Sequence, residues 1–235
     1  MDATLTEFGL TRSKYDSCLY FKEADGEKIY VSVFVDDLLI AGTSNKIISD
    51  FKSQIAARFS MKDMGPVTSI LGMEVQRDQE GSIKLSQSKY TEEVLKRFGF
   101  NNCKPCSTPL EANLQLWADG GAEKKEGPRG ATSEGGSESE RAGLERYREI
   151  VGSLMYLSVS TRPDISYAVG YLARFLNKPD VTHLKAAHHV LRYLRGTSTM
   201  GIRYHEGGDL LLKGSGWWTS VMEVYLTADR GALIY

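Results

Sequence analysis

The chain has 235 residues, of which 41% are hydrophobic and 25% charged, and its formal net charge at pH 7 is −1. This composition predicts one or two globular domains, and a net charge so near zero indicates neither a polyanionic nor a polycationic partner. The sequence has no apolar run of about eighteen residues and no secretory signal pattern, which argues against membrane-spanning and secreted classes. We therefore expect an intracellular protein without membrane contact.

The cysteines are Cys18, Cys103 and Cys106, too few and odd in number for the disulfide framework of a small secreted domain. Cys103 and Cys106 have the spacing of a zinc knuckle, but no second Cys or His pair stands at knuckle spacing to complete four ligands. We interpret them as ordinary loop cysteines of a protein in reducing surroundings.

An apolar run at residues 28–41, KIYVSVFVDDLLIA, is interrupted only by Asp36 and Asp37. It predicts two buried strands joined by a tight turn at the acid pair. A chain that needed only a turn would usually place Asn-Gly or Asp-Gly there. Two adjacent carboxylates attract a counter-charge, and Mg²⁺ prefers such ligands together with substrate phosphates, which suits nucleotidyl transfer. A solvated Asp-Asp turn is the alternative, and the local sequence leaves both open.

The segment after this hairpin changes from helix to strands and back to helix. Ser44 can cap a helix whose apolar residues recur at helical spacing. Residues 67–87 predict a second hairpin with its turn at Asp78 to Gly81. Gly72 within this hairpin is interpreted as a strand-interior glycine that permits close approach of another backbone. A helix then begins at Ser88 and stops at Gly99.

Residues 119–143 lack periodicity and large apolar side chains, and hold six acids and four bases up to Arg141, which predicts a disordered linker. Three helices are predicted beyond it, at residues 144–158, 164–177 and 180–195. Between the first two, Arg162 and Asp164 beside Pro163 are expected to form a capping and ion-pair unit. After Gly196 only short strand-like pieces can be recognised, and no structure is predicted for residues 215–235.

The third of these helices has a core-facing apolar stripe and an opposite stripe of basic residues. Between Leu144 and His205 nine Lys or Arg stand against four Asp or Glu. The basic stripe consists of Lys185, His188, Arg192 and Arg195. It could contact the phosphates of a nucleic-acid duplex, or it could be a solvated helix face. The histidines His183, His188 and His189 are interpreted as surface or packing residues rather than metal ligands.

Several segments, in the same order, resemble the reverse transcriptases of copia-type retrotransposons. Residues 34–38 (FVDDL) resemble the Tyr-Val-Asp-Asp hairpin of that family, with Phe34 in place of Tyr. The resemblance covers about residues 8–213. The other matching segments are residues 16–20 (DSCLY), 59–65 (FSMKDMG), 71–75 (LGMEV), 85–90 (LSQSKY), 104–109 (KP and TP at its ends), 147–157 (YREIVGSLMYL), 161–165 (TRPDI) and 191–197 (LRYLRGT).

The resemblance implies an α+β fold with a partial polymerase palm, a thumb and a helical connection toward an RNase H domain. The implied ranges are 1–75 for the partial palm, 76–118 for the primer-grip hairpin and thumb-like helix, 144–200 for the connection and 201–235 for a truncated or divergent RNase H-like start. Asp36 and Asp37 would be catalytic ligands of Mg²⁺ or Mn²⁺. The residues near the primer or nucleotide would be Phe34, Val35, Leu71 and Gly72.

The implied partners are an RNA or DNA template-primer and deoxynucleoside triphosphates, in cytoplasmic particles. The family's third aspartate lies on an upstream palm strand, so we expect that this chain alone does not polymerise and needs the amino-terminal half of the polymerase. Residues 215–220 lack the acids that begin the RNase H site. The alternative is a non-catalytic nucleic-acid-binding or interaction remnant of a degenerate element.

Overall fold

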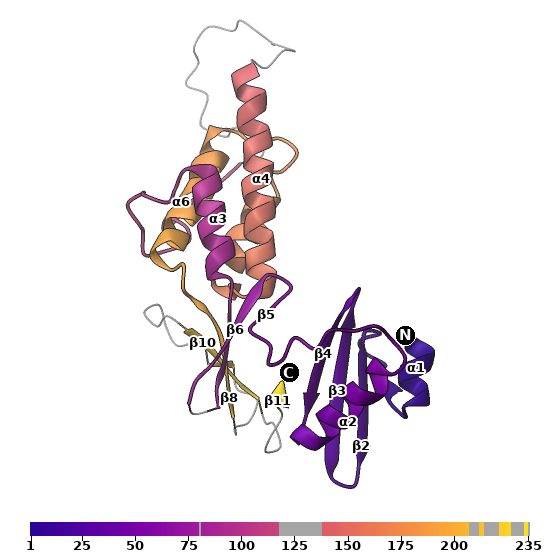
Figure 1. Ribbon diagram of the computed structural model, residues 1–235. Coiled ribbons are helices and arrows are strands. Elements are labelled where there is room, and N and C mark those ends of the chain that lie inside the picture. Colours follow the sequence, from indigo (N-terminus) through magenta and orange to yellow (C-terminus); the bar gives the residue numbers. More distant parts are fainter. Residues whose placement is uncertain (80, 118–137, 207–211, 214–220, 227–232, 235) are drawn as a thin grey trace, which may run out of the picture.

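The computed structural model (Figure 1) describes residues 1–79, 81–117, 138–206, 212–213, 221–226 and 233–234. Helices and two mainly antiparallel sheets make up the fold, which confirms the predicted α+β class. Among these residues, no helix combines the length and the apolar character needed to cross a membrane.

The first sheet contains the predicted acidic hairpin and is covered on one face by two helices (Figure 1). Its strands pair in the order β1-β2-β3-β4-β11, all antiparallel. The bounds are Thr11–Arg12 for β1, Leu19–Ala24 for β2, Glu27–Phe34 for β3, Asp37–Gly42 for β4 and Leu233–Ile234 for β11, with helices α1 at Asp2–Glu7 and α2 at Asn45–Ala56.

Helix α2 forms as the sequence predicts. Ser44 precedes it with an extended backbone, and its hydroxyl accepts a hydrogen bond from the Ile47 N–H at 3.3 Å. The side chains of Ile48, Phe51 and Ile55 lie on one face and are buried against the sheet. This helix therefore fixes which face of the sheet is the inner one.

The second sheet joins distant parts of the chain. Its order is β5-β6-β7-β8-β10-β9; β7 pairs antiparallel with β8 across a long stretch of sequence, and β10 pairs parallel with β8. The bounds are Ser69–Ile70 for β5, Met73–Arg77 for β6, Ile83–Ser86 for β7, Gly201–Glu206 for β8, Leu212–Lys213 for β9 and Val221–Leu226 for β10. Strand β11 of the first sheet follows, so the tail contains strands that the sequence did not predict.

The predicted hairpin at residues 67–87 is in fact three strands. Leu71 and Gly72, with φ values of 49° and 73°, form a two-residue turn between β5 and β6, since Ile70 pairs with Met73. The interpretation of Gly72 as a strand-interior residue was therefore wrong. Gly81, with φ 84°, lies in the β6–β7 loop near the expected turn.

The helices that follow β7 in the chain pack with one another and form a second hydrophobic core, separate from the core of the first sheet. Their bounds are Ser88–Phe98 for α3, Glu138–Ser160 for α4, Pro163–Ile165 for the 3₁₀ turn η1, Ser166–Ala173 for α5 and Val181–Gly196 for α6. Helix α3 ends at Gly99 in the left-handed conformation, as expected. Helix α4 begins inside the range predicted as linker, whereas residues 119–137 of that range lie outside the described residues.

The structure groups these elements differently from the ranges that the resemblance implies. The boundary between residues 75 and 76 falls inside β6. Val94, Leu95 and Phe98 of the thumb-like helix α3 share one core with Leu154 of α4 and Leu191 of α6. The helices of the segments 76–118 and 144–200 thus share one core.

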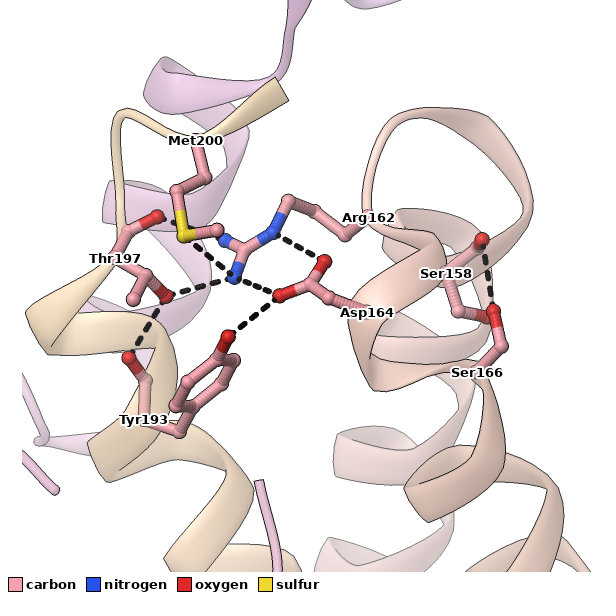
Figure 2. A network of polar contacts seen from close by, with 7 residues as sticks. All are labelled: Ser158, Arg162, Asp164, Ser166, Tyr193, Thr197 and Met200. Carbon is pink, nitrogen blue, oxygen red and sulfur yellow. Dashed lines mark hydrogen bonds and ion pairs between the residues drawn. The ribbon is translucent and has the colours of Figure 1, made fainter. Parts of the chain in front are cut away.

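Arg162 joins the end of α4 to the end of α6 (Figure 2). Its side chain is 1% exposed and makes a two-pronged ion pair with Asp164, at 2.9 Å from Nε and 2.8 Å from the second nitrogen. The guanidinium also donates to the carbonyl oxygen and hydroxyl of Thr197, and the Tyr193 hydroxyl donates to Asp164. The predicted ion pair is confirmed, with more partners than expected. The predicted cap is not found, because the N-cap residue Arg162 makes no side-chain capping hydrogen bond.

Candidate metal site at the hairpin tip

The acid pair lies at the tip of the β3–β4 hairpin. Phe34 pairs with Asp37, so the two turn residues are Val35 and Asp36, one position earlier than predicted, and Asp37 is the first residue of β4. Val35 has a φ of +53°, a conformation that a β-branched residue rarely adopts. Such backbone strain persists only where the surrounding structure imposes it, and it is common at functional sites.

The sheet alternation determines where Asp37 points. Leu38 and Ile40 belong to the core beneath α2, so Asp37 and Leu39 face the opposite side. Phe34 is the cross-strand partner of Asp37 and shares that side. Of the described residues, no helix covers this outer face, on which Tyr30 and Phe34 are exposed.

Asp36 and Asp37 are both exposed, and within the described residues neither carboxylate has a hydrogen bond or an ion pair. Two adjacent hard oxygen donors without a protein counter-charge fit the ligand preference of Mg²⁺. The described part of the chain brings no third Cys, His, Asp or Glu into a metal-binding group with them. An ion here would take its remaining ligands from water, substrate phosphates or other polypeptide.

Phe34 and Val35 form an apolar border to these acids, with 50% and 82% of their surface exposed. An exposed aromatic ring next to a cation site is suited to packing against a base or sugar of a nucleic-acid end. The four residues 34–37 are thus brought together as the sequence predicts.

Leu71 and Gly72 lie in the other sheet, in the turn between β5 and β6. The Tyr156 hydroxyl of α4 donates a short hydrogen bond to the Leu71 carbonyl, and a Cβ on Gly72 would be 2.8 Å from that hydroxyl. The Tyr156 ring packs edge-on against Tyr90, with centroids 5.0 Å apart. Tyr156, which the sequence analysis did not single out, therefore fixes this turn to the helices.

Three side chains of the basic stripe of α6 contact the loop after α3. Arg192 donates to the Lys104 carbonyl at 3.0 Å, and Arg195 donates to the Asn101 carbonyl at 2.6 Å. The His188 ring lies 4.8 Å from that of Phe100, and burial, with Arg146 nearby, lowers its pKa. Lys185 is exposed. Three of the four side chains thus make internal contacts.

The histidines beside this stripe serve packing and capping. His183 is fully buried and lies between the rings of Tyr147 and Phe175, and its Nδ1 accepts a hydrogen bond from the Asp180 N–H. The Cys106 thiol donates to the His189 carbonyl, and Cys103 and Cys106 are both half-buried. These positions agree with the packing and loop interpretations of the sequence.

Comparison with known proteins bears on the amino-terminal half most directly. Residues 1–112 match the family model described as reverse transcriptase (RNA-dependent DNA polymerase). No solved structure matches the chain.

Curated relatives extend this similarity over nearly the whole chain. The chain is 41% identical over 201 residues to a retrovirus-related Pol polyprotein from transposon TNT 1-94 of Nicotiana tabacum, covering 85% of this chain and 14% of that protein. It is 33% identical to a putative transposon Ty5-1 protein of Saccharomyces cerevisiae, covering 98% of this chain and 66% of the relative. An uncharacterized mitochondrial protein of Arabidopsis thaliana is 36% identical, and the alignment covers 77% of this chain and 68% of that protein.

These matches agree with the FVDD hairpin and with the segments on both sides of residues 118–137. The chain spans only part of each of these relatives, from 14% of the tobacco polyprotein to 68% of the Arabidopsis protein. With the family model and the relatives taken together, the chain belongs to the reverse transcriptase family of copia-type retrotransposons.

Proposed function

We propose that the chain is part of an RNA-directed DNA polymerase in which Asp36 and Asp37 bind the divalent cations, Mg²⁺ or Mn²⁺, of the polymerase site. The observation that supports this most is the pair of exposed carboxylates at a strained hairpin tip, without a partner among the described residues and with Asp37 on the uncovered face of the sheet. Two adjacent like charges repel each other, and a bound cation would offset that repulsion.

The metal ions, when bound, would neutralise the triphosphate and lower the pKa of the primer 3′-hydroxyl. Asp37 holds its oxygen donors on the open sheet face, where a template-primer end can approach, and Asp36 extends the same site at the turn. Phe34 lies beside them and packs against the primer end or the incoming deoxynucleoside triphosphate. The substrate class is therefore an RNA or DNA template-primer with a nucleotide.

A third carboxylate would complete this site. Strand β4 pairs with β11 only at Ala41 and Gly42, so among the described strands its outer edge is open beside Asp37. We propose that a palm strand from the amino-terminal half of the polymerase pairs along this edge and brings the third acid. The described residues would then give no primer extension by themselves, because two carboxylates position the ions poorly.

Metal binding to the whole chain tests the site directly. Titration with Mn²⁺, followed by electron paramagnetic resonance, should give a binding step that Asp36→Asn and Asp37→Asn each weaken roughly tenfold, on the scale of one lost ligand. The matched control is Asp25→Asn, because Asp25 also lies in a two-residue turn of the same sheet with φ +53°. Equal losses from Asp25→Asn and from the tip variants would refute the proposal.

Primer extension then tests the role of the missing strand. The chain alone should not extend an oligo(dT) primer on poly(rA), and addition of the amino-terminal half of the polymerase should restore extension that Asp37→Asn abolishes. The second candidate function is a non-catalytic nucleic-acid-binding remnant, favoured by the presence of only two acids at the tip among the described residues. It predicts salt-sensitive binding to the duplex without extension under either condition.

A further inference from the structure

Helix α5 carries a column of aromatic and cationic side chains that plays no part in the metal site. Tyr167, Tyr171 and Arg174 recur at four- and three-residue steps, so they lie on one face of the helix. The rings of Tyr167 and Tyr171 are stacked, with centroids 6.2 Å apart and planes at 23°. The Arg174 guanidinium carbon lies 5.7 Å from the Tyr171 ring centroid.

The inner end of this column is fixed. The Tyr171 hydroxyl accepts a hydrogen bond from the Leu116 N–H at 2.9 Å. Its ring also meets the ring of the buried Phe175 edge-on, at 5.8 Å and 75°. Tyr171 is therefore held by the core, and the outer ring stacks on a rigid base.

The outer end is open. The Tyr167 side chain is 81% exposed, and Trp117, next in sequence to the Leu116 that holds Tyr171, is 56% exposed. Single exposed aromatic residues are ordinary on protein surfaces. An exposed ring stacked on a fixed one, with an arginine over the fixed ring, is less ordinary, because it offers a flat π-surface to a planar partner.

The surroundings of the column are cationic. Arg174 and Lys178 are exposed at the end of α5, and Arg148 of α4 reaches the same end, where its Nε donates to the Leu176 carbonyl at 2.9 Å. The nearby carboxylate of Asp180 is engaged in capping α6. Arg148, Arg174 and Lys178 thus place three cations at or beyond this end of the helix.

Stacking rings beside positive charge match the chemistry of single-stranded nucleic acid, whose unpaired bases stack on aromatic side chains while cations follow the phosphates. We propose that this face of α5 binds single-stranded nucleic acid, with a base stacked on Tyr167 and phosphates contacted by Arg148, Arg174 and Lys178. The bases of a duplex are already stacked inside it and cannot use the open ring. This site needs neither Asp36 nor a metal ion.

Binding of labelled oligo(dT) to the full chain, measured by fluorescence anisotropy in EDTA, tests the site apart from the polymerase proposal. Tyr167→Ala should weaken the affinity roughly tenfold, the scale of one lost base stack, and Tyr167→Phe should leave it nearly unchanged. Arg174→Gln should also reduce the salt dependence, by about 0.7 in the log–log slope for one lost phosphate contact. A blunt duplex should bind more weakly than the single strand.

The controls distinguish base stacking on Tyr167 from nonspecific binding and from unfolding. Tyr15→Ala removes a tyrosine that is also exposed but belongs to the part of the chain that forms the first sheet. Tyr15 stacks on no other ring that the structure describes, so its loss should not change the affinity. Asp36→Asn should have no effect either. Circular dichroism of Tyr167→Ala should match the original chain, because an exposed ring contributes little to the core.

Two outcomes would overturn the proposal. One is single-stranded binding that Tyr167→Ala leaves unchanged, or an absence of such binding. The other is a chain that sediments as a dimer and becomes a monomer on Tyr167→Ala without loss of oligonucleotide affinity, which would make this face a protein interface instead.

Discussion

The hairpin tip and the cluster around Arg162 treat their charged groups in opposite ways. In the first sheet, Asp36 and Asp37 are exposed and have no protein partner among the described residues, on a sheet with one uncovered face. In the helical half, Arg162 is buried and its guanidinium is fully engaged by Asp164 and Thr197. The tip leaves its two charges available, whereas the Arg162 cluster uses its charges internally.

The difference indicates which charges belong to function and which to the fold. A buried ion pair with matched hydrogen bonds holds elements together and is expensive to break from one side. Exposed adjacent acids lower stability slightly and are retained where a ligand needs them. The basic stripe on α6 also serves the fold, because Arg192 and Arg195 donate to the backbone of the loop after α3.

The largest expected effect is on Arg162. Arg162→Ala removes the ion pair and the link to Thr197 and should lower the free energy of unfolding by about 3 kcal/mol, as expected when one partner of a buried pair is lost. Urea denaturation measures it. Arg174→Ala, at an exposed position, should change it by less than about 0.5 kcal/mol. Equal effects of the two variants would contradict the structural role assigned to the buried Arg162.

A smaller effect is expected at the start of α6. The Asp180 carboxylate accepts hydrogen bonds from the Thr182 N–H and hydroxyl and from the His183 N–H. Burial alone would raise the pKa of this carboxyl, but the hydrogen bonds from Thr182 and His183 outweigh it, and the pKa is lowered. Asp180→Ala should cost about 1 kcal/mol at neutral pH, the usual worth of a helix cap.

The pH dependence of this cap has a definite sign. A lowered carboxyl pKa means that the stabilisation is complete above the unfolded value, near 4, and is lost as the pH falls through the folded value. Thermal unfolding between pH 7 and pH 2 should show this loss in the original chain and less of it in Asp180→Asn, which keeps a capping side chain. If Asp180→Asn lost as much thermal stability between pH 7 and pH 2 as the original chain, the role of the Asp180 carboxylate in this pH dependence would be contradicted.

Interactions between residues close in sequence made much of this structure predictable. The Ser44 cap, the Gly99 stop and the ion pair around Pro163 each involve residues close in sequence, and each is found. The turn at Leu71 was missed because leucine rarely adopts positive φ and stands in an apolar run that looks like one strand.

Long-range contacts account for the remaining differences. The pairing of β7 with β8, the cover over Arg192 and the contact of Tyr156 with Leu71 all join residues far apart in the chain. Periodicity describes one element at a time and carries no information on its partners. At the candidate site, the sequence predicted the acid pair and its hairpin, but not that the acids lie at the end of an uncovered sheet face.

The smallest expected effect concerns the hairpin tip, where two turns of the same sheet can be compared. The β2–β3 turn has Asp25-Gly26, a sequence suited to positive φ, whereas the β3–β4 turn has Val35 at φ +53°. Val35→Gly should relieve about 1–2 kcal/mol of left-handed strain and lose about 0.5–1 kcal/mol to backbone entropy, a net gain of roughly 0.5 kcal/mol. Urea denaturation should register this gain, while Mn²⁺ binding at Asp36 weakens because the tip is less rigid. A loss of stability would mean that the Val35 side chain contributes contacts that outweigh its strain.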